Sequence, residues 1–218
     1  MKSKWLQIIH DFKKLDIEEK ANAVTHFLGL ISAIILAPFI YYSISEKFSL
    51  VEEIGFGFFV FAVLFMLFSS TYYHIQIEAR KKMKWYKIDH ISIFVLIGAS
   101  YTVFLLYFMP YTKGYLFIGL MWALILVGVI LKMFLDHKIP EVVFTLMYLA
   151  LGWMYVFIHQ DMISAMSDQN FIWLCIGGIG YTIGAIFFSL EKIKFNHAIW
   201  HIGVLIGVYG HLISLYLA

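Results

Sequence analysis

The residues of this chain best suited to chemistry are polar side chains beside long apolar runs. Three pairs share i, i+4 spacing: Asn22/His26, Ser70/His74 and His197/His201. Residues four apart lie on one face of a helix. His197 and His201 can therefore reach one metal ion from one helix, as paired histidines do in helical zinc sites. His74 can supply a third nitrogen, and three histidines with a water form the open, catalytic kind of zinc site.

Asp89 and the cysteine content narrow the chemistry further. Asp89 begins another apolar run and adds a carboxylate at the same expected depth as the pairs. The chain has one cysteine, Cys175, so it forms neither an intramolecular disulfide nor a Cys-rich zinc site. A metal must then be held by His, Asp or Glu.

Each of these patterns also has an explanation that involves no metal. A lone histidine at a membrane boundary is commonly an anchor, and a single H-x-x-x-H arises often by chance. Three pairs and an acid at one depth together favour a metal site. The remaining histidines are weaker candidates: His90, which points elsewhere around its helix than Asp89, and His10, His137, His159 and His211, which fall away from the cluster.

Composition indicates which elements must position these residues. Hydrophobic residues make up 62% of the 218-residue chain and charged residues 14%, against about half and a quarter in soluble domains. A soluble protein of this size could not bury so much apolar surface. A helical span needs roughly 20 apolar residues. Seven segments qualify: 24–44, 52–74, 89–109, 115–134, 140–158, 170–190 and 197–217.

The basic residues predict the direction of these spans, since cytoplasmic loops are enriched in Lys and Arg. Of 16 such residues, all but Lys47 and Lys113 fall on one side if the N-terminus is cytoplasmic. We therefore expect an all-α integral membrane protein with seven transmembrane helices, the N-terminus cytoplasmic and the C-terminus outside. The inner membrane boundary then holds all seven polar candidates: Asn22, His26, Ser70, His74, Asp89, His197 and His201.

The chain divides into a leader and a membrane domain. Residues 1–23 place Trp5, Ile8, Ile9, Phe12 and Leu15 at helical spacing among lysines, which predicts either a cytoplasmic amphipathic leader or a merely solvated one. Residues 24–218 hold the seven-helix transmembrane domain. Within it, Gly180/Gly184 and Gly203/Gly207 form G-x-x-x-G pairs, which predict close approach of the last two helices.

Four motifs carry a family resemblance over nearly the whole chain. They are E-K-A-N-A-V-T-H (Glu19 to His26), S-S-T-Y-Y-H (Ser69 to His74), Asp89 in K-I-D-H, and H-A-I-W-H (His197 to His201). In this order the chain resembles the hemolysin III branch of the progestin and adipoQ receptor (PAQR) family. The resemblance implies zinc held by His74, His197 and His201, with Asp89 at the water beside the zinc and Ser70 next to the site. Asn22 and His26 are better assigned either to the surroundings of the ligands or to the start of their helix.

The resemblance also implies a setting and a substrate class. The family is similar to intramembrane hydrolases that include alkaline ceramidases, and its bacterial members are connected to membrane lipid homeostasis. A zinc-dependent hydrolase of lipid amides or esters in a bacterial cell membrane is therefore the leading hypothesis, with a membrane lipid as substrate or ligand. Two alternatives stay open: a pore-forming cytolysin, and a receptor or regulator with structural zinc.

Overall fold

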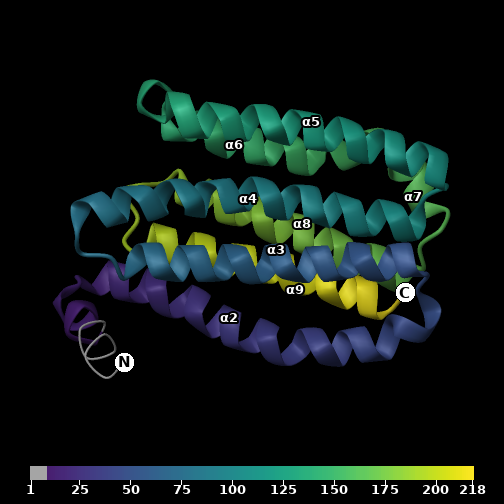
Figure 1. Cartoon of the computed structure of the whole chain (residues 1–218), viewed down its shortest axis with the longest axis horizontal. Coiled ribbons are helices and arrows are strands. Elements are labelled where there is room, and N and C mark those ends of the chain that lie inside the picture. The colour runs from purple at the N-terminus through teal and green to yellow at the C-terminus, as the bar shows by residue number, and fades with distance from the viewer. Residues whose placement is uncertain (1–8) are drawn as a thin grey trace.

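The computed structural model describes residues 9–218, and these contain helices and turns without a strand. The α-helices are α2 (Ile17–Ile44), α3 (Leu50–His74), α4 (Ala79–Phe108), α5 (Tyr111–Leu135), α6 (Glu141–Gly152), α7 (His159–Ile163), α8 (Asp168–Phe188) and α9 (Asn196–Tyr216). Short 3-10 turns cover Ser45–Lys47, Asp136–Lys138 and Trp153–Phe157, here η1, η2 and η3. The long helices run side by side along the molecule (Figure 1).

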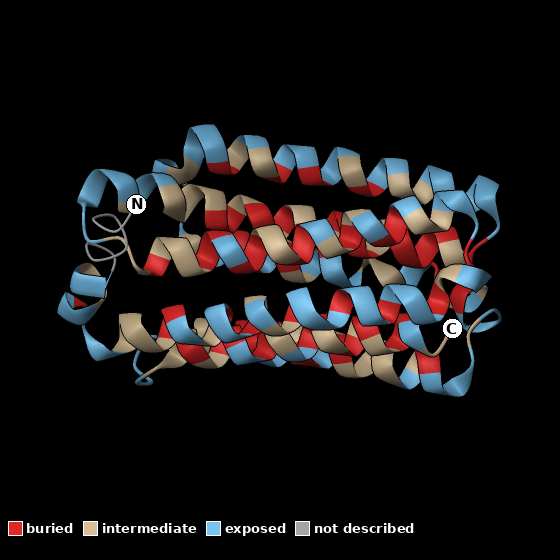
Figure 2. Ribbon diagram, turned by 60° about the horizontal axis from the view of Figure 1, so that its bottom comes forward, coloured by how far each residue is buried: buried red, intermediate tan, exposed pale blue. Residues whose placement is uncertain are grey.

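Six described helices are long and apolar enough to cross a membrane: α2 with its η1 extension, α3, α4, α5 with η2, α8 and α9. Large apolar side chains also face outward, among them Ile35, Phe39 and Leu116, at 66%, 62% and 73% exposed, and the outer surfaces of the bundle are exposed along its length (Figure 2). An exposed apolar surface of this extent requires lipid as its solvent. The prediction of an all-helical multi-pass membrane protein is confirmed.

The α-helix within the expected span 140–158 is shorter than the helices in the other expected spans. Pro140 precedes α6, and the helix gives way after Gly152 to the turn η3. The Tyr101 hydroxyl of α4 donates to the carbonyls of Leu151 and Gly152, at 3.0 and 2.8 Å. These bonds satisfy carbonyls that a helix end leaves unpaired. Residues 9–218 therefore contain six helices of spanning length and one shorter apolar segment, and the count of seven spans stays a prediction.

Two helices begin earlier than hydropathy suggested. Helix α2 starts at Ile17, where the Asp16 carboxylate accepts a hydrogen bond from the Glu19 amide at 2.8 Å. Helix α4 starts at Ala79 and includes the basic segment before Asp89. The predicted amphipathic leader falls partly outside the described residues. Its residues 9–14 are described and are helical. Hydropathy marks the apolar part of a helix, whereas charged residues such as Lys and Arg continue it.

The core joins the helices that carry the polar pairs. Helix α9 packs against α8 and α2, and α3 packs against α2 and α4. A second apolar cluster connects α4 with α5 and α6: Phe94, Met121, Ile125, Phe144, Tyr148 and Leu151. The first turn of α9, the last turn of α3 and the beginnings of α2 and α4 consequently meet at one end of the bundle.

The last two helices approach as their glycines predict. A Cβ added at Gly203 would lie 2.7 Å from the Gly184 Cα and 2.8 Å from the Gly180 carbonyl oxygen. Both distances are shorter than atoms tolerate, and the obstacles are backbone rather than movable side chains. Small residues at this spacing allow helix backbones to touch.

Gly203→Ala is therefore expected to destabilise the protein by about 1–3 kcal/mol, the usual cost of forcing a methyl group into a packed interior. Thermal unfolding in detergent measures the change. Gly178→Ala in α8 is the matched control, because no heavy atom lies within 4 Å of the added Cβ. Equal thermal midpoints for the two variants would contradict the close packing of α8 on α9.

Candidate metal centre

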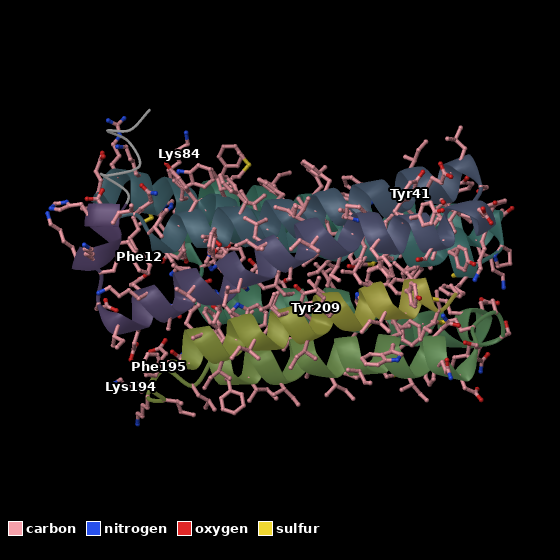
Figure 3. All side chains as sticks on the ribbon, turned by 90° about the horizontal axis from the view of Figure 1, so that it is seen from below. Phe12, Tyr41, Lys84, Lys194, Phe195 and Tyr209 are labelled. Carbon is pink, nitrogen blue, oxygen red and sulfur yellow. The ribbon has the colours of Figure 1, made fainter. Side chains whose placement is uncertain are left out.

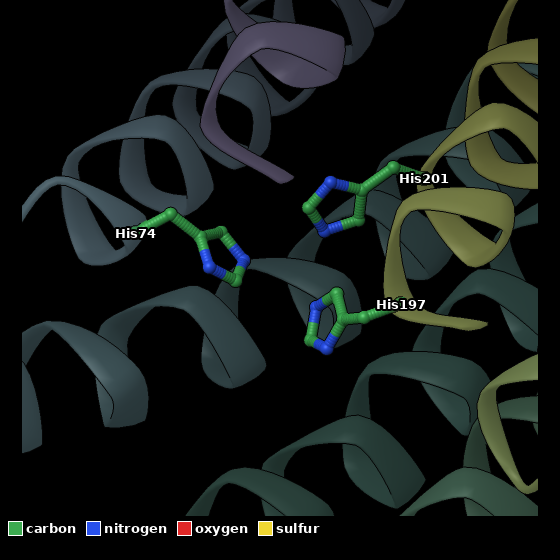
Figure 4. Close-up of side chains that lie close together, drawn as sticks. All are labelled: His74, His197 and His201. Atoms are coloured by element: carbon green, nitrogen blue, oxygen red, sulfur yellow. The ribbon is translucent and has the colours of Figure 1, made fainter. Parts of the chain in front are cut away.

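Three histidines from two helices face one another at this end of the bundle. His74 is the last residue of α3, and His197 and His201 lie in the first two turns of α9. One ring nitrogen from each lies within 4.8 Å of the others, and the three imidazoles surround a shared space (Figure 4). His74 and His201 are buried, while His197 is partly exposed. The three predicted ligands are thus brought together, and the cluster could hold a metal ion.

The start of α9 is set by an unusual backbone. Phe195 has φ 61° and ψ 19°, in the left-handed region that non-glycine residues rarely adopt. Asn196 follows it, and its side-chain amide donates to the Phe188 carbonyl of α8 at 3.0 Å. Lys194 and Phe195 lie at the beginning of α9 (Figure 3). This turn fixes the point at which α9 begins and so the direction in which His197 leaves the helix.

Hydrogen bonds orient two of the three rings. The His74 Nδ1–H donates to Glu19 Oε2 at 2.8 Å, which leaves His74 Nε2 buried and without a hydrogen-bond partner. The His201 Nδ1–H donates to the Asn22 carbonyl at 3.0 Å, so its Nε2 is the nitrogen that carries the lone pair. Metal-binding histidines ordinarily donate their other N–H to a carboxylate or carbonyl in this way. The donor set therefore fits a metal with a preference for imidazole.

Glu19 is a functional candidate that the sequence analysis missed. Its second oxygen accepts a hydrogen bond from Lys82 Nζ at 2.8 Å, so the carboxylate is held between α3 and α4. The signal was present, because Glu19, Asn22 and His26 follow one another at spacings of three and four and so share one face of α2. Thr25 was also missed, and its hydroxyl oxygen lies 3.0 Å from His201 Nδ1.

Glu19→Gln is expected to weaken metal binding by about 10- to 100-fold, the usual effect of losing a carboxylate behind a ligand histidine. Glutamine keeps the shape of the side chain but removes the charge that favours the donating Nδ1–H of His74. Competition with a chelator of known affinity measures the change. Glu18→Gln is the control, since it neutralises the neighbouring acid on α2. Equal metal affinities in the two variants would refute the role of Glu19.

Asn22 and His26 surround the cluster in different ways. The Asn22 backbone carbonyl, rather than its side chain, accepts the hydrogen bond from His201. His26 stacks on His201 with ring centroids 3.6 Å apart and 13° between the planes. Neither ring nitrogen of His26 has a hydrogen-bond partner, although both are buried. The two residues support His201 and do not belong to the three-histidine group.

Asp89 and Ser70 lie beside the cluster on the wall of one cavity. This cavity of about 330 Å³ is lined at one end by Ser70, Asp89, His26 and His201 and continues between α4, α6, α8 and α9. Ser70 Oγ lies 3.5 Å from His201 Nε2. Asp89 is buried and also lines a smaller cavity together with His197. Both predicted residues thus share open space with the histidines.

His90 belongs to a separate buried network. Its Nδ1–H donates to the Tyr86 carbonyl at 2.8 Å, and its Nε2 lies 2.6 Å from Glu141 Oε1. Lys132, which lies near the inner end of the expected span 115–134, is fully buried in α5 and forms ion pairs with Asp136 at 2.8 Å and Glu141 at 3.3 Å. Breaking such a buried pair is costly, so this network holds the α5–α6 hairpin to α4.

The fold and the cluster define a multi-pass helical membrane protein with a three-histidine group at one end of the bundle. The chain belongs to the family described as Haemolysin-III related, which matches residues 16–212. The resemblance to the hemolysin III branch, inferred from the motifs, is confirmed.

Individual relatives extend over most of the chain. It is 34% identical over 190 residues to the Hemolysin-3 homolog of Bacillus subtilis (strain 168), which covers 87% of this chain and 89% of that protein. It is 32% identical to the Hemolysin-3 of Bacillus cereus, over 87% and 86% of the two chains. The human Monocyte to macrophage differentiation factor is 25% identical over 201 residues, 88% of this chain and 81% of that protein.

Proposed function

We propose that the chain is a zinc-dependent hydrolase of lipid amides or esters. The observation that carries this proposal is the single cavity shared by Ser70, Asp89 and His201, polar at the cluster and apolar beyond it. Its volume of about 330 Å³ lies in the range of sites for small molecules. A lipid fits this shape because its reacting carbonyl can lie at the polar end and its hydrocarbon chain along the apolar wall.

His74, His197 and His201 would hold the zinc ion. Three neutral imidazoles favour zinc among the common metals, and no cysteine of the chain lies among the clustered ligands. When bound, zinc supplies a Lewis acid that makes water nucleophilic at neutral pH. Glu19 keeps the His74 Nδ1–H engaged, which directs the lone pair of Nε2 toward the cluster.

Asp89 and Ser70 perform the remaining steps. Asp89 orients the attacking water and accepts its proton as the oxygen adds to the carbonyl carbon. Ser70 donates a hydrogen bond to the carbonyl oxygen as negative charge develops there. The proton held by Asp89 then passes to the departing amine or alcohol as the carbonyl–nitrogen or carbonyl–oxygen bond breaks. The products are a fatty acid and the released amine or alcohol.

The proposed topology has seven spans with the N-terminus cytoplasmic. Helix α2 begins at the end of the bundle opposite the C-terminus (Figure 1), as an odd number of crossings requires. Lys84 and Lys194 lie at the cluster end, while Tyr41 lies at the other (Figure 3). The excess of Lys and Arg at the cluster end favours a cytoplasmic position for it. The cluster would then meet lipids of the inner leaflet.

Purified, zinc-loaded protein in lipid nanodiscs tests the hydrolase proposal. A panel of N-acyl amides and acyl esters is supplied, and released fatty acid is quantified by mass spectrometry. The proposal expects metal-dependent release that chelation abolishes. The names of the Bacillus relatives suggest lysis instead. Ion conductance in purified liposomes without fatty-acid release would support a pore, and metal binding with neither activity would support a receptor or regulator.

A further inference from the structure

The far end of the large cavity carries polar groups that the proposed hydrolysis does not use. Helix α9 lines the cavity from His201 at the metal cluster to His211. Ten residues of helix correspond to about 15 Å at the usual rise. Tyr181 of α8 and Tyr155 of η3 line the cavity as well. The rings of Tyr181 and His211 are in contact, with centroids 5.5 Å apart.

Three polar atoms at this end are buried without a hydrogen-bond partner: Tyr155 OH, Tyr181 OH and His211 Nδ1. Native proteins leave few such atoms unsatisfied, because each costs roughly 1–3 kcal/mol. At the metal end the cavity is lined by Ser70, Asp89 and His26, and both ring nitrogens of His26 are likewise buried without a hydrogen-bond partner. The cavity is therefore polar at both ends and apolar between them, where Leu96 and Val204 line it.

The chemistry of the far end selects the kind of group that it would bind. Two phenols and an imidazole can each give or receive a hydrogen bond, and a hydroxyl group offers one donor and two acceptors to match them. Among the residues of 9–218 that line the cavity, Asp89, at the opposite end, is the only Asp, Glu, Lys or Arg. A carboxylate or ammonium group at the far end would be buried without a counter-charge, which is far more costly than burying a hydroxyl.

We propose that Tyr155, Tyr181 and His211 form a hydroxyl-binding subsite. The preferred lipid then carries a hydroxyl group on its hydrocarbon chain, about 15 Å from the group at the metal cluster, by the helix rise between His201 and His211. This inference rests on the proposed function in one respect. The proposed function places the reacting group of the lipid at the metal cluster, and the hydrocarbon chain then runs along the cavity to the far end. The subsite concerns binding, however, and does not require that hydrolysis occurs.

A matched pair of fatty acids tests the subsite. Oleate and ricinoleate differ by one hydroxyl group in the middle of the chain, and their affinities for the zinc-loaded, full-length protein are measured by calorimetry in detergent. We expect ricinoleate to bind about tenfold more tightly, the value of one hydrogen bond made to a buried partner. An α-hydroxy fatty acid, whose hydroxyl lies beside the carboxylate, is expected to gain nothing at the far end.

Single-residue variants show which side chains produce the preference for ricinoleate over oleate. Tyr181→Phe is expected to bind oleate as the wild type does and to bind ricinoleate no better than oleate. Tyr155→Phe repeats the test if Tyr181→Phe fails to fold. Tyr209→Phe is the matched control, because its hydroxyl donates to the Gly29 carbonyl at 3.3 Å, away from the cavity; it should keep the full preference for ricinoleate.

The outcomes separate this inference from the hydrolase proposal. Equal affinity of the wild type for the two fatty acids would overturn the subsite and leave water as the partner of these atoms, while metal binding and turnover would stand. A preference for ricinoleate that survives in Tyr181→Phe and Tyr155→Phe would overturn the assignment to these residues. A tenfold preference in a protein without turnover would support the subsite and count against the hydrolase alone.

Discussion

Asp89→Asn is expected to lower the rate of lipid hydrolysis about 100- to 10,000-fold, the usual contribution of a positioned general base, while leaving the metal in place. Asparagine has nearly the same shape but cannot accept the proton of the attacking water. Asp89 lies outside the group of three histidines whose nitrogens could bind the ion. The variant therefore separates the chemical step from metal binding, which a histidine substitution cannot do.

Turnover under substrate saturation, together with metal content, measures this effect. Asp161→Asn is the matched control, because Asp161 forms an ion pair with Lys113 at 2.9 Å in a partly exposed position away from the cluster. It should keep full activity. An Asp89→Asn protein that is folded, metal-loaded and fully active would remove Asp89 from the mechanism.

Zinc is expected to stabilise the metal-stripped wild type, with no stabilisation of His201→Ala. An ion that binds only the folded state adds about 2.7 kcal/mol at a free concentration one hundred times its dissociation constant. His201 also stacks on His26 and donates to the Asn22 carbonyl, so its removal alone lowers stability. The quantity to compare is therefore the rise in thermal midpoint on adding zinc, within each variant.

His159→Ala provides the control for that measurement. His159 begins α7 and its Nδ1 bonds the Val156 carbonyl at 2.7 Å, remote from the three-histidine group. The variant should gain as much from zinc as the wild type does. A similar zinc-induced rise in His201→Ala would show that the ion binds elsewhere.

The three-histidine cluster could be predicted from the sequence because two simple rules coincide. Spacing of four residues puts His197 and His201 on one helix face, and the alternation of spans brings the end of one helix to the beginning of another. The structure places His74 next to both. The apolar runs likewise predicted the long helices, since lipid demands about 20 apolar residues from each.

Other features depend on contacts that no local pattern encodes. The bond between Glu19 and His74 requires the particular packing of α2 on α3. At the early end of α6, the hydrogen bonds to the Leu151 and Gly152 carbonyls come from Tyr101 of another helix. The burial of the Lys132 charge, near the inner end of the expected span 115–134, depends on the ion pairs with Asp136 and Glu141. A hydropathy scale treats a charged side chain as solvent-exposed because it does not include the partners that neutralise the charge.

Metal content of the purified protein tests the central claim most directly. Wild type and the His197→Ala/His201→Ala double variant are expressed in zinc-supplemented medium, purified in the same detergent and analysed by mass spectrometry for all first-row transition metals. We expect about one zinc ion per wild-type chain and none in the folded double variant. A folded wild type that holds no metal, or a double variant that keeps it, would contradict the three-histidine zinc site and the hydrolysis built on it.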